Sequence, residues 1–156
     1  MKATLILLGL LLVVVAGMFA VGSSWSGPAA ALVPFTILAE GPHSVIDSRV
    51  NYLITTQEEF AALWELLKEP PPAPTVDFSA NVVAAVFAGE APTTGYAIAV
   101  AEVEDADSRI VKIELARPDE SCVLAQSLTA PYQIIELPKT SLPFTHSDIW
   151  TTKACQ

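Results

Sequence analysis

The chain has 156 residues, of which 17 are acidic and 8 are basic, giving a formal net charge of −9. A chain of this length is expected to form one domain. All the acidic residues follow Gly22, so the part after it is more acidic than the whole. Such a domain repels nucleic acid and anionic lipid, and we expect no nucleic-acid partner.

An uninterrupted apolar segment, residues 3–21, follows Lys2. It is long for the core of a signal peptide and just long enough to span a bilayer, and small residues lie at its exit, at Ala20 and Gly22. Residues 1–22 are therefore interpreted either as a cleaved signal peptide or as an uncleaved N-terminal membrane anchor. Both interpretations place the rest of the chain outside the cytoplasm, in the cell envelope, the periplasm or the medium, with membrane contact only through this segment.

Residues 23–34 are small, uncharged and interrupted by Gly and Pro, which indicates a linker. Residues 35–156 are predicted to form the single folded domain. Its first predicted strands lie at 35–40 and 49–55, with a turn between them.

An amphipathic helix is predicted over residues 57–68. Thr56 and Glu59 form a capping box at its start, and Pro70 ends it. The apolar residues that fall on one helical face are Phe60, Leu63, Trp64 and Leu67. We expect this face to pack on the core.

The chain after the proline-rich connection is predicted to be rich in strands. Residues 81–89 are apolar at odd and at even positions alike, which indicates a strand covered on both faces. The other predicted strands are 96–104, 109–115, 121–129 and 132–138, and the tail from Thr140 is predicted to be irregular. The expected fold class is α+β, with an antiparallel sheet or sandwich of about six to eight strands and one packed helix, preceded by an N-terminal apolar helix.

The chain contains two cysteines, Cys122 and Cys155. In an exported domain a single pair of cysteines most often forms a disulfide. Such a bond would close a loop of about 34 residues, for which the chain-entropy model gives about 3–4 kcal/mol of stability. It would also hold the C-terminus against the body of the domain.

No residue pattern predicts a reaction. The two histidines, His43 and His146, are far apart in the sequence, and there is no zinc or calcium signature, phosphate-binding loop or nucleophile elbow. We therefore predict no catalytic residues, no metal site and no cofactor, and we expect that the protein is not an enzyme. A hydrolase with an unrecognised site remains one alternative.

The most distinctive segment is GEAPTTGYAI, residues 89–98. Pro92 fixes φ, Gly95 permits a positive φ, and the hydroxyls of Thr93 and Thr94 can bond free amides of the bend. One interpretation is a tight connection with Tyr96 packed beneath it. The other is a stiff partner-binding tip formed by Pro92, Thr93, Thr94, Gly95 and Tyr96, because a rigid loop loses little entropy on binding.

Several short motifs follow one another in a definite order: Val76-Asp77-Phe78, Gly89, Pro92-Thr93-Thr94-Gly95-Tyr96, Thr129-Ala130-Pro131-Tyr132 and Leu137-Pro138-Lys139. With these motifs the chain resembles the PrcB C-terminal domain family, named for a subunit of a protease complex of the outer envelope. The resemblance spans residues 76–139. It implies an exported accessory domain that binds or stabilises other proteins, and it does not imply an active site.

A second, local resemblance concerns the PTTGY segment. It is similar to the loop by which chagasin-like inhibitors enter the cleft of papain-type cysteine proteases, but Ala91 stands where that family has Asn. The later Arg-Pro-aromatic loop of that family is only half matched, by Arg117-Pro118-Asp119. Its Gly-rich middle loop has no match in residues 97–116.

The function expected from these observations is that of a non-catalytic protein-interaction module of the cell envelope, accessory to a protease complex or stabilising it. Its partner would be another envelope or secreted protein, such as a protease. The alternative is a cysteine peptidase inhibitor that acts through residues 91–96.

Overall fold

The computed structural model describes residues 30–155, so the predicted signal peptide or anchor helix and most of the predicted linker lie outside the described residues. The elements in chain order are β1 (Ala31–Leu32), β2 (Thr36–Gly41), β3 (Val50–Ile54), α2 (Gln57–Leu66), β4 (Asn81–Phe87), β5 (Ala97–Asp105), β6 (Arg109–Pro118), β7 (Tyr132–Pro138) and β8 (Phe144–Lys153). Within this part of the chain, no helix has the length and apolar character needed to cross a bilayer.

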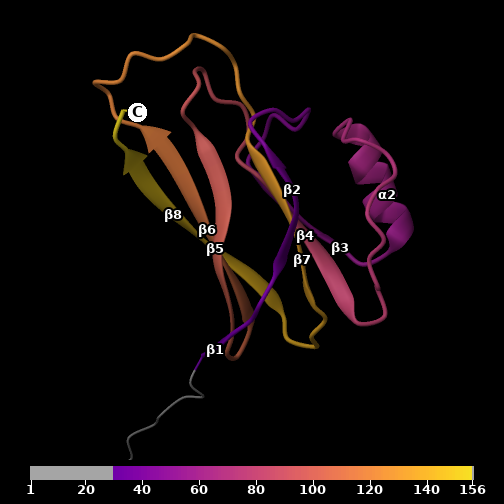
Figure 1. The fold of residues 1–156 in the computed structure, drawn as a ribbon. Coiled ribbons are helices and arrows are strands. Elements are labelled where there is room, and N and C mark those ends of the chain that lie inside the picture. The colour runs from indigo at the N-terminus through magenta and orange to yellow at the C-terminus, as the bar shows by residue number, and fades with distance from the viewer. Residues whose placement is uncertain (1–29, 156) are drawn as a thin grey trace, which may run out of the picture.

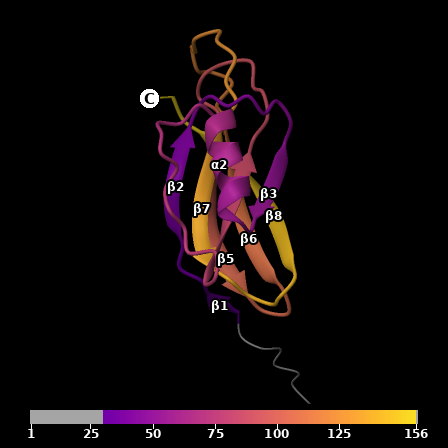
Figure 2. The same ribbon diagram turned by 90° about the vertical axis from the view of Figure 1, so that its right-hand side faces the viewer.

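The strands form two four-stranded sheets that face each other as a sandwich (Figure 1). One sheet has the order β1-β5-β6-β8, and the other has the order β2-β7-β4-β3. Helix α2 packs on the outer face of the second sheet, as Figure 2 shows. Every strand pair is antiparallel except β6 with β8. The predicted α+β class, a mainly antiparallel sandwich with one packed helix, is confirmed for residues 30–155.

Strand β4 is covered on both faces, as its sequence predicts. The residues that face the other sheet are Val82, Ala84 and Val86, and those that face the helix are Val83, Ala85 and Phe87. Phe60 and Trp64 of the helix complete the apolar core between α2 and this sheet, with 0% and 7% of their surface exposed. The apolar face of α2 is therefore part of the core, because it covers the face of the sheet that does not pack on the other sheet.

Helix α2 begins at the predicted cap. The Thr56 hydroxyl accepts a hydrogen bond from the N–H of Glu59 at 3.2 Å. In return, the Glu59 carboxylate accepts one from the N–H of Thr55 at 3.1 Å, and this bond lowers the pKa of Glu59. The helix ends at Leu66, earlier than predicted, because Lys68 enters the left-handed region with a φ of 59°.

The prediction of a strand at 121–129 is wrong. These residues form an irregular connection between β6 and β7, and most of them are exposed. Since β6 and β7 belong to different sheets, the connection must cross the end of the sandwich and cannot join either ladder. It starts in a turn where the Asp119 carboxylate accepts bonds from the N–H and the hydroxyl of Ser121.

The prediction of an irregular tail is also wrong, because Phe144–Lys153 forms the ten-residue strand β8. The chain reverses direction when it passes to β7 in the opposite sheet and again when it returns, so β8 runs parallel to β6. Hydrophobic alternation does not reveal this strand, because β8 lies at the edge of the sandwich. Its side chains that face inward include the polar residues His146 and Asp148.

Candidate functional site

Three connections and the C-terminus meet at one end of the sandwich, which we call the loop end: residues 42–49, 88–96, 119–131 and 154–155. The loop end is at the top of Figure 1. The opposite end carries the turns at 106–108 and 139–143. The PTTGY segment belongs to the loop end, because β4 ends there and β5 begins there.

The segment is anchored at its start by Gly89. This residue has a φ of +82°, and a Cβ added to it would lie 2.9 Å from the backbone nitrogen of Arg49. Only glycine fits both conditions without strain. The next residue, Glu90, donates its N–H to the carbonyl of Asp47 at 2.9 Å. The connection 88–96 is thus fixed against the connection 42–49.

The middle of the segment is held by the connection 119–131. Ala91 and Thr129 exchange two backbone hydrogen bonds of 2.8 and 2.9 Å. The N–H of Thr94 donates to the carbonyl of Ala125 at 3.2 Å, and the Thr129 hydroxyl donates to the carbonyl of Thr93 at 3.0 Å. Among the described residues, these bonds hold the bend, in place of the bonds expected from the hydroxyls of Thr93 and Thr94.

The end of the segment is fixed by Gly95, whose φ is +93°. A Cβ on Gly95 would lie 3.2 Å from the Cβ of Pro118, so the segment passes close to the end of β6. Tyr96 is half-buried, while Pro92 is exposed. The five predicted site residues therefore form one continuous bend, in which Thr93, Thr94 and Tyr96 are half-buried and the other two are exposed.

Cys122 and Cys155 form the predicted disulfide, with their Cα atoms 5.2 Å apart. The bond joins the connection 119–131 to the segment that follows β8. The N–H of Asp119 also donates to the carbonyl of Lys153 at 2.9 Å. The longest connection of the loop end is therefore tied to β8 at two points. Disulfides persist in oxidising compartments, so this bond is compatible with an extracytoplasmic protein.

The surface of the loop end combines apolar and acidic side chains. Val123 is fully exposed and Leu128 is 60% exposed. The acidic residue Glu120 is exposed on the same connection, 119–131, and Glu90 is exposed on the connection 88–96. Apolar side chains on a braced backbone are suited to binding another protein, since they bury surface without first having to become ordered.

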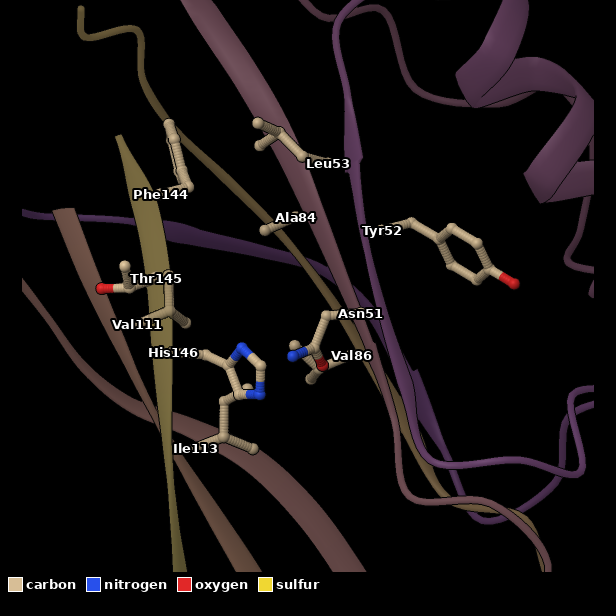
Figure 3. A pocket seen from close by; sticks show the side chains of 10 residues that line it. All are labelled: Asn51, Tyr52, Leu53, Ala84, Val86, Val111, Ile113, Phe144, Thr145 and His146. Carbon is tan, nitrogen blue, oxygen red and sulfur yellow. The ribbon is translucent and has the colours of Figure 1, made fainter. Parts of the chain in front are cut away.

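A separate groove of about 180 Å³ opens at the side of the sandwich, between β3 and β8 (Figure 3). The apolar residues from the sheets that line it are Ala84, Val86, Val111 and Ile113. In Figure 3 the side chains of His146 and Asn51 face each other across the groove, and Tyr52 points away from it. An ion pair between Arg49 and Asp148, 2.7 Å long, spans the same side of the sandwich.

Within residues 30–155, no three His, Cys, Asp or Glu side chains come together as a metal ion would require. Sequence reasoning did not identify Thr129 as a support of the bend, although its motif was noted. It also did not identify Val123 as an exposed apolar residue, because that residue was placed in a strand. The pairing of Arg49 with Asp148 carries no local signal in the sequence, since the two residues are 99 positions apart.

The family model described as PrcB C-terminal matches residues 82–138. This stretch runs from β4 to β7 and includes both the PTTGY bend and the connection that holds it. The resemblance inferred from the ordered motifs is confirmed by this match. No curated protein and no solved structure matches the chain.

Proposed function

Because residues 82–138 match the PrcB C-terminal family, we propose that the chain is an exported, non-catalytic module of the cell envelope that binds another protein through its loop end. The partner in this proposal is a component of a protease complex, which the module assists or stabilises. The disulfide between Cys122 and Cys155 and the apolar segment at residues 3–21 support a place outside the cytoplasm.

The observation that carries the proposal is the bracing of the loop end. Two connections that are far apart in the chain are joined by the hydrogen bonds of Ala91 with Thr129 and of Thr94 with Ala125. A loop that is already ordered keeps more of its contact energy when it binds. Val123 and Leu128 supply apolar surface, worth about 25 cal/mol for each Å² that a partner covers. The exposed carboxylates of the loop end favour a partner with basic groups around an apolar patch.

The proposal is tested by capture of the partner from cell envelopes. An affinity tag placed after Ser141, at the end opposite the loop end, leaves the binding surface free. The full chain should then retain a protein associated with a protease. The triple variant Thr93→Ala, Thr94→Ala, Tyr96→Ala should lose this protein.

Tyr96 is half-buried, so a folding defect in the triple variant must be separated from a binding defect. A second variant, Pro92→Arg with Val123→Asp, changes only exposed positions of the loop end and should also lose the partner. Asp107→Ala, in the turn at the opposite end, is the matched control and should retain it. Equal capture by all folded variants would contradict binding through the loop end.

A second candidate function is inhibition of papain-type cysteine peptidases. It gains one supporting observation, because the close approach of Gly95 to Pro118 brings the PTTGY bend next to the Arg117-Pro118 pair. In this function the bend and the end of β6, which lie together at one end of the sandwich, enter a protease cleft together. In this function, Pro92 and Thr93 would contact the enzyme.

This second function predicts that the chain slows one or more papain-type peptidases when present at micromolar concentration. Pro92→Arg should weaken the inhibition at least about tenfold, as expected when a central contact of an interface is replaced by a charge. If no enzyme of a broad panel is slowed, the inhibitor function is excluded, and envelope capture remains the test of the first proposal.

A further inference from the structure

Among residues 30–155, strand β8 is the longest edge strand of the sandwich. Of the other edge strands among residues 30–155, β1 has two residues, β3 has five, and β2 is interrupted by a register shift between Ile37 and Ala39. β8 has ten residues that pair with β6 in unbroken register. Short strands, bulges and inward-pointing charges are usual protections of an edge. β8 is neither short nor bulged, and its inward charge, Asp148, is paired with Arg49 of the same chain.

The free side of β8 is open to pairing. None of the hydrogen bonds found among residues 30–155 reaches this side of the strand. Ile149 is 45% exposed and Trp150 is 61% exposed, so both have apolar surface that a second strand could cover. No proline interrupts the strand, and its one lysine or arginine is Lys153 at the end. Figure 2 shows that β3 and β8 lie along the same side of the sandwich.

We propose that β8 pairs antiparallel with β8 of a second copy of this chain, with the two Ser147 residues opposite each other. This register places His146 opposite Asp148 of the other copy and Phe144 opposite Trp150 of the other copy. Each pairing occurs twice because the arrangement has two-fold symmetry. The Asp148 carboxylate already accepts hydrogen bonds from Arg49 of its own chain, and the imidazole of the other copy adds a further partner. An imidazole beside a carboxylate and an aromatic pair are both favourable cross-strand neighbours.

The side-chain directions agree with this arrangement. His146 and Asp148 lie beside Val111 and Ile113 of β6, so both are on the inner face of the sheet. Phe144 packs on the same inner core. Residues on one face of a strand stay on one face of a continuous sheet, so these four positions of each copy meet on the same side.

Neighbouring registers lack this complementarity. Placing Asp148 opposite itself sets two carboxylates side by side, and placing His146 opposite itself sets two imidazoles side by side. Two opposed carboxylates destabilise a strand pair, and two opposed imidazoles lose the carboxylate neighbour. With Ile149 opposite itself, Asp148 faces Trp150 and both imidazole–carboxylate pairs are lost. The side-chain pattern of β8 therefore favours the register centred on Ser147 over these neighbours.

The resulting dimer joins two four-stranded sheets into one continuous sheet and leaves the loop end of each copy uncovered by the strand pairing. It does not depend on the proposed binding of a protease component. The dimer presents two loop ends, so a partner with two binding positions would gain avidity from it.

Cysteine crosslinking tests the register in the full chain. In Ser147→Cys the two new thiols lie opposite each other, within the distance that a disulfide spans. Mild oxidation should then give a covalent dimer. Thr145→Cys is the matched control on the same strand and face, because in this register its two copies lie about 13 Å apart, too far for a bond. We expect the dimer yield of Ser147→Cys to exceed that of Thr145→Cys at least about tenfold.

A mixture of Thr145→Cys chains with Ile149→Cys chains provides the second readout, since these positions face each other in the proposed register. It should give a covalent heterodimer, and His146→Asp should reduce the dimer fraction seen by sedimentation. The proposal is overturned if Ser147→Cys forms no dimer, if Thr145→Cys crosslinks equally well, or if Ser147→Cys attaches instead to a different protein.

Discussion

At the end of helix α2, a single residue adopts a backbone conformation that its side chain disfavours. Lys68 has a φ of 59°, and its N–H and that of Glu69 donate to the carbonyls of Glu65 and Trp64. This pattern is the helix ending in which glycine is preferred. Lys68→Gly should therefore raise the free energy of unfolding by about 0.5–1 kcal/mol, measured by urea denaturation.

The control for this variant is Glu65→Gly, which introduces the same residue inside the helix. It should lower the free energy of unfolding by about 1 kcal/mol, because glycine there adds flexibility without relieving strain. A loss of stability in Lys68→Gly would show that the side chain of Lys68 contributes more than the strained backbone costs.

A second residue-scale prediction concerns Arg109, a charged residue that is only 3% exposed. Its guanidinium makes two hydrogen bonds of 2.7 Å to the Asp105 carboxylate, also donates to the carbonyl of Pro138, and lies over the ring of Phe144. The bonds from Arg109 lower the pKa of Asp105 below its ordinary value of 3.8. Asp105→Asn should destabilise the fold by about 1–3 kcal/mol at neutral pH, because it removes a charge-assisted bond.

The pH dependence of this effect follows from the direction of the pKa shift. Because the pKa of Asp105 is lower in the folded state than in the unfolded state, the stabilisation is complete above the unfolded value and is lost as pH falls through the folded value. The difference in stability between the wild type and Asp105→Asn should thus be constant above about pH 5 and shrink below about pH 4. Urea midpoints measured across this range check it, and a difference that grows in acid would contradict it.

Among the elements, β5 and β7 are linked by one buried polar side chain. The side-chain oxygen Oε1 of Gln133 accepts a hydrogen bond from the backbone N–H of Val100 at 2.7 Å. This bond lies beside the register shift between Val100 and Glu102. The side-chain amide of Gln133 donates to Glu40 at 2.7 Å. Gln133→Leu leaves the buried N–H of Val100 without its partner and should cost about 1–3 kcal/mol in chemical denaturation.

The variant Glu40→Ala separates the two bonds of Gln133, since it removes only the exposed partner. It should cost less than about 1 kcal/mol. If Glu40→Ala costs as much as Gln133→Leu, the link between β5 and β7 is not what stabilises this position.

The elements that the sequence predicts well are those with an apolar repeat. The helical spacing of Phe60 and Trp64 predicts the buried face of α2. The unbroken apolar run of β4 predicts that both faces of this strand are buried. β8 escapes prediction because an edge strand has no single apolar face. The segment 121–129 is misleading because Val123 and Leu128 suggest a strand, whereas both are exposed in a connection.

For the whole molecule, the disulfide is the covalent link between the loop end and the last strand. Replacing both Cys122 and Cys155 by Ser should lower the free energy of unfolding by about 3–4 kcal/mol, because the unfolded chain regains the freedom of the closed loop. Calorimetry with and without a reductant measures this change. Unchanged stability after reduction would contradict a structural role of the bond.

The composition of the candidate site could be predicted from the sequence, but its support could not. Pro92 and Gly95 mark a stiff bend, and their motif led to the PrcB resemblance. The partners that hold the bend, Ala125 and Thr129, lie more than 30 positions away. Long-range contacts of this kind follow from the way the two sheets stack, which local patterns do not encode.

The central claim is that this protein meets its partner with the loop end of the sandwich. Site-specific photo-crosslinking in the source cells tests it most directly, with the reactive residue placed at Val123 in one strain and at Asp107, at the opposite end, in another. Both positions are exposed, so neither change should disturb the fold. We expect one defined adduct with an envelope protein from position 123 and none from position 107. Adducts from position 107 alone would contradict the claim.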